Sequence, residues 1–562
     1  MGLYIGSDRR RKGMLLVNQI KVYPNYTYDE LRKKAAAVLK VFDSDINFVK
    51  IEKLSIDARK KPEIFFILSL LVDVKNENSV LKRCPVDRVS LYKEIKYSPI
   101  VNGSERMNNR PVIIGAGPAG LFCAYYLAKY GYRPIIFERG YDIDIRTKDV
   151  EEFFRTGVLK RNSNVQFGEG GAGAFSDGKL NTLVKDHFGR NKAVLELFVE
   201  CGADENILTD AKPHIGTDVL VDVIKNLRNK IKSFGGEFRF NAEVTDINFK
   251  DGKVNEIVIN KNIKHPAEVC VLAIGHSARN TFSMLYDKDI KLSQKEFAVG
   301  FRVEHDRKFI DDAMYGENNK FTKFLPTATY KLTYKASNGR GVYSFCMCPG
   351  GYVVNASSEM SRTCVNGMSY KARDSRHSNS AIIVTVDTKD FGSDHPLAGM
   401  YFQQKIEENA YNLAGGAIPV EYYKDFKNEV ISGLTDLNNV EPDDMLSISP
   451  ECKGRFLYSR LSDILPYEIN ETFVEGMEYF DRIIPGFAAD NVILSGIESR
   501  TSSPIRIERD ELFESVSHKG LYPAGEGAGY AGGIMSAAMD GMKVFEAIAA
   551  KYKCFEEMIN DD

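Results

Sequence analysis

Residues 115–120 read Gly-Ala-Gly-Pro-Ala-Gly, the glycine spacing of a loop that holds the pyrophosphate of a dinucleotide. Gly115 permits a tight turn, Gly117 lets the backbone approach the phosphates, and Gly120 lets a helix pack closely against a strand. The helix that follows offers free amide groups and a partial positive charge to the phosphates. The residues of this loop expected to bind the dinucleotide are Gly115, Gly117, Pro118, Ala119 and Gly120.

An acidic residue stands where a ribose would be bound. Glu138 ends the next apolar strand, 18 residues after Gly120, and its carboxylate is expected to accept both ribose hydroxyls. The same carboxylate would repel a 2′-phosphate, so the sequence predicts a ligand without one. Arg139 follows directly and is included in the predicted site. FAD and NAD both satisfy these requirements.

The far end of the chain favours FAD. Residues 527–532 again fit the glycine spacing, but no strand with a terminal acid follows before Asp562, so we do not expect a second dinucleotide fold. The short strand, the Ala-Gly-Glu turn and the helix of small residues resemble the segment of large flavoproteins that closes over the ribityl chain and flavin. That segment usually carries Asp in place of Glu526. The residues expected to bind here are Gly525, Glu526, Gly532, Gly533 and Ile534.

Residues 166–180 form a glycine-rich stretch that contains Lys179. Residues 173–179 also fit a phosphate-loop spacing, but Leu180 occupies the position that must supply a hydroxyl group to Mg²⁺, which argues against an NTPase. We instead predict a loop around the flavin, where Lys179 stabilises the negative charge that reduction places near N1. The alternative is a surface lysine after a turn. The residues expected to bind here are Gly170, Gly171, Ala172, Gly173, Phe175, Ser176 and Lys179.

Two internal strands are similar to parts of the glutathione-reductase-like FAD domain. In residues 241–244, Val244 is expected to present its backbone to the adenine. Residues 271–276 resemble the apolar strand that passes under the cofactor, which adds Ala273, Gly275 and His276 to the predicted site. His276 either contacts the flavin or serves as a helix cap or packing residue.

Four stretches resemble a group of uncharacterised bacterial FAD-dependent dehydrogenase-like proteins. They are residues 166–180, 297–305, 346–351 and 502–506. The likeness covers nearly the whole chain and includes a small N-terminal domain of the same size. It implies FAD and redox chemistry but no substrate, because the group has no settled reaction.

Four side chains are candidates for catalysis: Lys179, Cys346, Cys348 and Arg302. A Cys-x-Cys pair beside a flavin could relay electrons as a dithiol. Alternate positions of a regular strand, however, hold two thiols too far apart for an easy disulfide, so packing is the alternative. Arg302 shares a strand face with Glu304, and this face either lines a substrate site or meets water. No histidine spacing and no Cys-x-x-Cys motif fits a metal, and we expect none.

The 562 residues predict several domains, and a hydrophobic fraction of 43% with a charged fraction of 27% is typical of a globular protein. We predict an α/β fold: a Rossmann-like, glutathione-reductase-type FAD-binding domain with an inserted α+β substrate domain and a small N-terminal α+β domain. The predicted boundaries place the N-terminal domain at 1–105, the FAD-binding domain at 106–290 and 486–562, and the substrate domain at 291–485.

The expected function is an FAD-dependent oxidoreductase that transfers hydride between an organic substrate and the flavin, with NAD(P)H or another redox partner bound transiently. Residues 1–110 hold 22 Lys and Arg against 13 Asp and Glu, so one alternative is a flavoprotein that modifies RNA, although we consider nucleic-acid binding the weaker reading of this charge. The other alternative is a non-enzymatic flavin redox sensor. An odd count of nine cysteines and the lack of a long apolar run favour a cytoplasmic protein without a membrane span.

Overall fold

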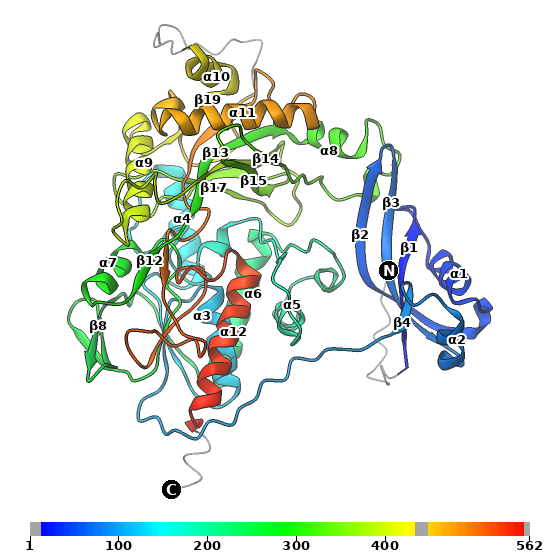
Figure 1. The fold of residues 1–562 in the computed structure, drawn as a ribbon, viewed down its shortest axis with the longest axis horizontal. Helices are drawn as coiled ribbons and strands as arrows, with labels where there is room; N and C mark the ends of the chain where they lie inside the picture. The colour runs from blue at the N-terminus through cyan, green and yellow to red at the C-terminus, as the bar shows by residue number, and fades with distance from the viewer. Residues whose placement is uncertain (1–12, 433–447, 556–562) are drawn as a thin grey trace.

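The computed structural model describes residues 13–432 and 448–555. The outer ends of the predicted first and last segments, residues 1–12 and 556–562, lie outside the described part, as do residues 433–447. Figure 1 shows a body with a central sheet at the lower left, a second sheet above it, and a small lobe at the right. A long extended segment joins this lobe to the lower sheet.

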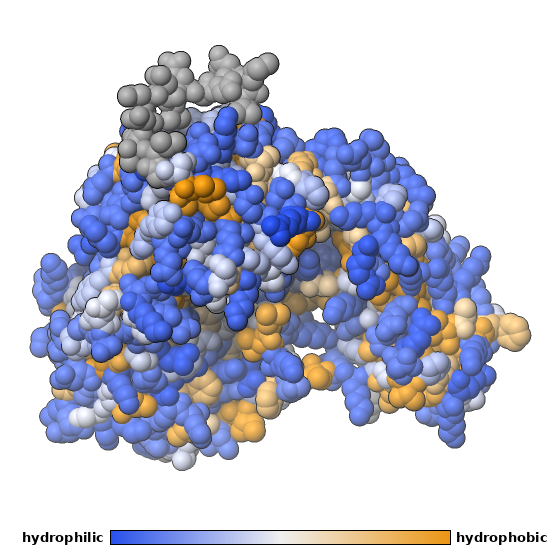
Figure 2. Space-filling view, turned by 45° about the horizontal axis from the view of Figure 1, so that its top comes forward, coloured by the Kyte–Doolittle hydropathy of each residue, from blue (hydrophilic) through white to orange (hydrophobic). Residues whose placement is uncertain are grey.

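The small lobe is a sheet covered by helices. Its strands follow the order β2-β3-β1-β4, with α1 and α2 packed beside them (Figure 1). Thr27 caps α1 through its hydroxyl, which accepts a hydrogen bond from the Glu30 amide at 3.3 Å. Figure 2 shows that the surface is hollowed between this lobe and the rest of the molecule. The elements are β1 (Leu15–Val22), α1 (Tyr28–Leu39), β2 (Ile46–Lys60), β3 (Glu63–Val74), α2 (Glu77–Arg83) and β4 (Val89–Leu91).

The central sheet has the strand order β24-β11-β5-β6-β7, and every neighbouring pair is parallel. Its side chains alternate between two buried faces, as a sheet covered on both sides requires. Ile113, Ile136 and Val271 face the helices, whereas Val112 and Cys270 face the opposite layer. The strands are β5 (Val112–Ile114), β6 (Ile135–Phe137), β7 (Glu237–Arg239), β11 (Cys270–Leu272) and β24 (Leu521–Pro523).

Helices cover one face of this sheet and an antiparallel meander covers the other. The two layers belong to separate apolar clusters that meet at the sheet. The helices are α3 (Pro118–Lys129), α4 (Ile143–Thr156), α5 (Arg190–Glu200), α6 (Thr217–Ser233) and α12 (Ile534–Lys551). The meander consists of β8 (Val244–Lys250), β9 (Lys253–Ile259) and β10 (Ile263–Pro266), and α7 (Arg279–Asp287) lies beside it.

The chain reverses direction across the sheet at β5. It passes from β5 to β6 and β7 on one side, and β11 and β24 add to the other side. In open parallel sheets, ligands bind beyond the carboxyl ends of the strands at such a switch point. The loops after β5, β6, β11 and β24 therefore form the expected edge for a site.

The upper sheet is mostly antiparallel and has the order β14-β15-β18-β13-β22-β19-β21. Its strands are β13 (Phe297–Asp306), β14 (Thr333–Lys335), β15 (Gly341–Cys348), β18 (His377–Val386), β19 (Ile418–Tyr422), β21 (Phe456–Tyr458) and β22 (Ile493–Glu498). Its helices, of which α11 crosses above the sheet in Figure 1, are α8 (Arg307–Tyr315), α9 (Ala398–Ala414), α10 (Tyr423–Ser432) and α11 (Tyr467–Ile483). Two small sheets complete the body, built from β16 (Tyr352–Asn355), β17 (Val365–Met368) and β20 (Cys452–Lys453), and from β12 (Leu292–Gln294) and β23 (Ile505–Ile507).

The upper sheet extends past residue 485, where the sequence placed the end of the substrate domain. β22 lies beyond that point, yet it pairs with β13 and β19 in the middle of this sheet. The predicted boundary placed it in the FAD-binding part. β22 is buried along its whole length, and its sequence alone does not show which sheet it joins. Among the described helices, none has the length and apolar character needed to cross a bilayer.

Candidate functional site

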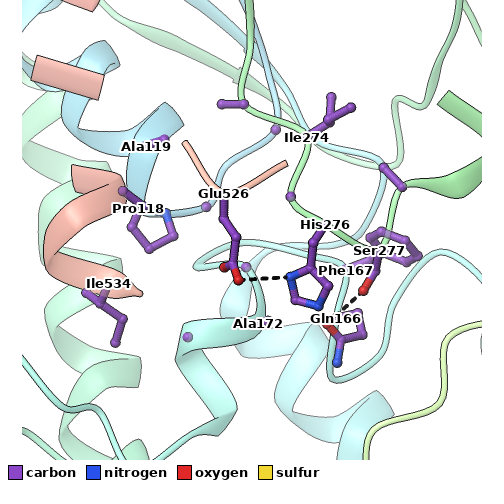
Figure 3. Close-up of a pocket in the computed structure, with 18 of the residues that line it drawn as sticks. Pro118, Ala119, Gln166, Phe167, Ala172, Ile274, His276, Ser277, Glu526 and Ile534 are labelled. Atoms are coloured by element: carbon purple, nitrogen blue, oxygen red, sulfur yellow. Dashed lines mark hydrogen bonds and ion pairs between the residues drawn. The ribbon is translucent and has the colours of Figure 1, made fainter. Parts of the chain in front are cut away.

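A cavity of about 370 Å³ lies at the carboxyl ends of β5, β6, β11 and β24 and reaches the upper sheet. Its volume falls within the range of ligand pockets, about 300–1,000 Å³. Figure 3 shows the central part of its wall, where the loop before α3, the strand end at Ile274 and the start of α12 meet. The cavity thus lies at the switch point of the central sheet.

The three glycines of the first loop have different surroundings. Gly115 has φ +101°, which favours glycine, and a Cβ there would collide with the Ala273 carbonyl. A Cβ on Gly120 would collide with the Gly115 carbonyl, so this glycine lets α3 pack against the loop. A Cβ on Gly117 would find its nearest neighbour, the Gly171 Cα, 3.8 Å away. Gly117 therefore borders open cavity, as the predicted approach of a pyrophosphate requires.

Glu138 lies at the end of β6 and organises the loops around the cavity. Its side chain is 5% exposed and lines the cavity. One carboxylate oxygen accepts from the Ala116 amide at 2.8 Å, and the other accepts from the amides of Gly140 and Gly168 at 2.9 and 3.0 Å. The acid predicted from the spacing therefore fixes the loop after β5 relative to the glycine-rich segment.

The side chain of Arg146 in α4 supports the glycine-rich segment, a role that the sequence did not indicate. Its side chain is fully buried and donates hydrogen bonds to five backbone carbonyls between residues 164 and 171, at 2.6–3.2 Å. Glu169 in the same segment accepts from the Ile143 amide at 2.8 Å and pairs with Arg228 at 2.6 Å. A buried cation therefore replaces regular secondary structure as the support of this loop.

The cavity end near Glu138 is closed by Arg139. Its guanidinium lies 4.2 Å from the centre of the Phe167 ring and pairs with Glu243. A second bond runs from Arg139 to Asn280 at 3.1 Å. Val244 begins β8 beside this group and lines the cavity, where the sequence placed the adenine.

The turn after β24 is held by Asp540 of α12. This carboxylate accepts from the Gly525 amide at 2.7 Å and pairs with Arg509 at 2.7 Å. Glu526 points into the cavity, and its carboxylate lies 3.5 Å from His276 Nδ1 (Figure 3). Within the described residues, the buried Nε2 of His276 has no hydrogen-bond partner. His276 is thus a cavity residue with one ring nitrogen free for a ligand.

Lys179 lines the cavity on the side of the upper sheet and is held by Asp177, 3.1 Å away. Arg373 pairs with the same carboxylate. Burial disfavours the charged amine, but Asp177 together with the two cysteines Cys346 and Cys348 outweighs this cost and raises the pKa of Lys179. Lys179 is therefore a fixed cation at the cavity wall, and the alternative of a free surface lysine is not supported by its contacts.

The other catalytic candidates divide into two groups. Cys346 lines the cavity, whereas Cys348 and Arg302 are fully buried behind it and do not. Arg302 pairs with Glu498 at 2.9 Å and donates to the Asn379 side chain at 2.8 Å. The expectation that the Arg302 face lines a substrate site or meets water is therefore wrong, because β17 packs over this face.

Most residues of the predicted cofactor site lie together on the cavity wall. The exceptions are Gly120, Gly170, Phe175 and Gly525, which pack directly behind it. Each touches a supporting side chain or backbone: for example, the Phe175 ring lies 4.9 Å from the Arg146 guanidinium. The residues of the site on the wall are Gly115, Gly117, Pro118, Ala119, Glu138, Arg139, Gly171, Ala172, Gly173, Ser176, Lys179, Val244, Ala273, Gly275, His276, Glu526, Gly532, Gly533 and Ile534.

Several polar wall residues were not predicted. Ser277 donates to the Gln166 side chain at 3.0 Å (Figure 3), and Arg500 donates to Ser277 at 3.0 Å. Thr501 also lines this end. Gln166 is the first residue of the glycine-rich segment, and Thr501 directly precedes residues 502–506. Their positions at the ends of these motifs were the signal from which they could have been predicted. No group of three or more His, Cys, Asp or Glu side chains placed to hold a metal occurs in residues 13–432 and 448–555.

The cavity fits FAD. The first turns of α3 and α12 both border it, and each offers amides that have no partner within its helix. A Cβ on Gly275, Gly532 or Gly533 would meet open space, so the backbone is accessible along this wall. His276 adds an unpaired donor or acceptor. Together with the central sheet, these features define the site of a dinucleotide-binding flavoprotein.

Comparison with known proteins agrees with this class. Residues 296–501 match the model of an FAD-dependent protein, C-terminal domain-like, residues 113–161 match an NAD(P)-binding Rossmann-like domain, and residues 14–73 match a domain of unknown function. An uncharacterized protein of Clostridium beijerinckii is 45% identical over 540 residues, which cover 95% of this chain and 98% of that protein. The chain belongs to the same family as this protein, and residues 296–501 match the C-terminal domain of an FAD-dependent protein.

Solved structures with partial similarity are much more distant. Glycine oxidase from Geobacillus kaustophilus is 12% identical with a TM-score of 0.33, covering 79% of this chain and 96% of that chain. L-proline dehydrogenase from P. horikoshii is 14% identical with a TM-score of 0.33, covering 81% and 96%. Similarity at this level does not assign a substrate.

Proposed function

We propose that the chain transfers hydride between a small organic substrate and FAD, with the substrate bound between the central and upper sheets. The observation that carries the proposal is one continuous cavity. Gly117 and Glu138 line it at the central sheet, and its other end is lined by Cys346 of the upper sheet, Asn366 of β17 and Thr501 after β22. A cofactor that fills the first end would expose its far end to the second.

The roles of the residues follow from this arrangement. FAD, when bound, supplies a carrier of two electrons and a hydride. The loop at Gly117 and the start of α3 would bind the pyrophosphate, and Glu138 would accept from the ribose. Lys179 would hold a positive charge beside the ring, fixed in place by Asp177. The upper sheet, which lies above the cavity, would exclude water from the substrate.

The partners and compartment are also proposals. Among the described residues, a glycine loop within a β-α-β unit occurs only at 112–137, and FAD would occupy it. NAD(P)H or another redox partner would therefore bind transiently, at the cavity mouth. The nine cysteines of the chain are all free of disulfide bonds, as is typical of a protein in a reducing compartment. We propose the cytoplasm as its location.

The test begins with the cofactor. Heating a sample of the purified protein should release FAD rather than FMN. In a separate, unheated sample, NADH, NADPH or a member of a metabolite panel should bleach the flavin absorbance under anaerobic conditions. Release of FMN, or of NAD alone, would contradict the proposal. Retention of FAD with no reduction by any organic donor would instead favour a non-enzymatic redox sensor.

A further inference from the structure

β15 departs from a regular strand at Cys346. Between Phe345 and Cys348 the register with β18 shifts, so that three steps along β15 face the two steps from Ala381 to Asn379. Cys346 itself has φ +44°, in the left-handed region. The extra residue is a β-bulge, which removes the regular alternation of side chains. The wide spacing expected for Cys-x-Cys on a regular strand therefore does not apply.

The bulge places the Cys348 thiol close to Cys346. A hydrogen bond from the Cys348 thiol lowers the pKa of Cys346 to about 5, with Lys179 and Arg302 adding to the effect against the cost of burial. The same contact raises the pKa of Cys348, which therefore keeps its proton. The Cys348 sulfur also lies 3.3 Å from the Cys346 carbonyl. At neutral pH the pair holds one thiolate and one thiol.

The two cysteines differ in their access to the cavity. Cys346 lines the cavity wall, and Cys348 is fully buried behind it. Arg302 donates to the Cys346 carbonyl at 2.7 Å and lies 3.6 Å from the Cys348 sulfur. A Cβ on Gly367 would come within 2.6 Å of the same sulfur, so glycine at this position leaves room for the thiol. Reactive cysteines occur in such electropositive, partly accessible surroundings.

We propose that Cys346 and Cys348 are a redox-active pair, in which Cys346 attacks and Cys348 resolves, and which exchanges two electrons with FAD and with a disulfide substrate. This inference rests on the proposed function, because it requires FAD in the cavity. None of the roles proposed above for the cavity residues involves these two thiols. They lie on the upper sheet, where the end of the cavity proposed for the cofactor meets the end proposed for the substrate.

The chemistry of the pair balances with a disulfide as the oxidant. The Cys346 thiolate forms a bond to one sulfur of the disulfide, and the other sulfur leaves as a thiolate. The Cys348 thiol then loses its proton, its sulfur bonds to that of Cys346, and the second substrate sulfur leaves. The proton passes to a released thiolate. The pair has lost two electrons, which reduced FAD can return, and the Cys346–Cys348 disulfide becomes two thiols again.

The first test measures the thiolate without using enzyme activity. Holoprotein is treated with iodoacetamide between about pH 6 and pH 8, and the labelled peptides are quantified by mass spectrometry. The rate of alkylation at Cys346 should change by less than about twofold over this range. Alkylation of a thiol with an ordinary pKa slows about tenfold for each unit by which the pH falls. Cys452 is a matched control, because it is also partly exposed but burial raises its pKa. A tenfold decline per unit at Cys346 would overturn the proposal.

The second test counts electrons. Holoprotein is oxidised with a small disulfide, freed of reagent and titrated anaerobically with dithionite. Wild type and Cys452→Ser should take up four electrons per FAD, and Cys346→Ser should take up two. Cys348→Ser should also take up four, because its Cys346 remains in a mixed disulfide with the reagent, which mass spectrometry detects. Mass spectrometry should find the Cys346–Cys348 disulfide only where both cysteines are present.

The outcomes separate this inference from the proposed function. Normal FAD content with two electrons taken up by wild type, and no disulfide, would overturn the thiol pair and leave hydride transfer intact. Absence of FAD from the purified protein would overturn both the proposed function and the exchange with FAD. If either serine variant does not fold, the corresponding alanine variant takes its place in the titration.

Discussion

The amine of Lys179 lies 3.1 Å from the carboxylate of Asp177, and Arg373 donates hydrogen bonds to both oxygens of the same carboxylate. Burial opposes the charge of Asp177, but the two cations outweigh it and lower its pKa. All three groups are therefore charged at neutral pH. This arrangement fixes a cation at the cavity wall without leaving Asp177 as a free negative charge in the cavity.

Replacing Lys179 with alanine should leave FAD bound but make it harder to reduce, since a positive charge near N1 favours the anionic reduced ring. One charge-assisted contact contributes about 1.5–3 kcal/mol, which corresponds to a fall of roughly 30–60 mV in the two-electron midpoint potential. Potentiometric titration of both proteins measures the change. Lys179→Arg keeps the charge and should retain most of the potential. An unchanged midpoint in Lys179→Ala would place the amine away from the ring.

Replacing Arg146 with methionine should destabilise the protein and weaken its hold on FAD. The variant leaves five buried carbonyls without their donor, at a cost of about 3 kcal/mol or more. The loss is measured by urea denaturation and by the FAD retained after gel filtration. Arg155→Met on the exposed side of the same helix is the control and should change neither. Full FAD retention in Arg146→Met would mean that the glycine-rich loop does not need this support.

Local patterns in the sequence predicted the local parts of the site. The glycine loop, Glu138 and the turn at Glu526 each depend on residues close together in the chain, and all line the cavity. Such features are set by backbone conformation and by the alternation of apolar residues, which neighbouring residues determine.

The parts that were not predicted depend on distant contacts. Arg146 reads as an ordinary helix residue until the loop at 164–171 folds over it. The strand of Arg302 alternates as expected, but its polar face is buried because β17 of another sheet packs over it, where a Cβ on Gly367 would meet the Arg302 guanidinium. The bulge at Cys346 is likewise a property of the register with β18. Pairing between distant strands cannot be inferred from the pattern of either strand alone.

Replacing Glu407 with glutamine should lower the free energy of unfolding. Glu407 is fully buried and pairs with Arg279 at 2.7 Å and Arg500 at 2.8 Å. Removing its charge leaves two buried guanidinium groups with less compensation, which typically costs about 3–5 kcal/mol. Denaturant unfolding at neutral pH measures the loss. Glu408→Gln, at the exposed neighbouring position, should be within about 0.5 kcal/mol of wild type.

The same pair predicts a dependence on pH. Burial opposes the charge of Glu407, but Arg279 and Arg500 outweigh it and lower its pKa well below the usual value. Its contribution to stability is therefore complete above the unfolded pKa of about 4.3 and is lost as the pH falls through the lower folded value. The difference between wild type and Glu407→Gln should stay constant from about pH 8 to pH 5 and shrink only in more acidic solution. A difference that shrinks already near neutral pH would contradict the assigned ion pairs.

Two glycines of the first loop should respond in opposite ways to valine. Gly117 has φ −79° and borders open cavity, so Gly117→Val should fold with a denaturation midpoint close to that of cofactor-free wild type and yet fail to bind FAD. The added methyl groups would occupy the space in which the pyrophosphate approaches the backbone. Gly120→Val should instead unfold at lower denaturant, because its side chain would meet the Gly115 carbonyl within the fold. Circular dichroism separates the two effects from the FAD content measured by absorbance. If Gly117→Val retained FAD at full occupancy, the pyrophosphate would have to lie elsewhere, and the placement of the cofactor along this cavity would be wrong.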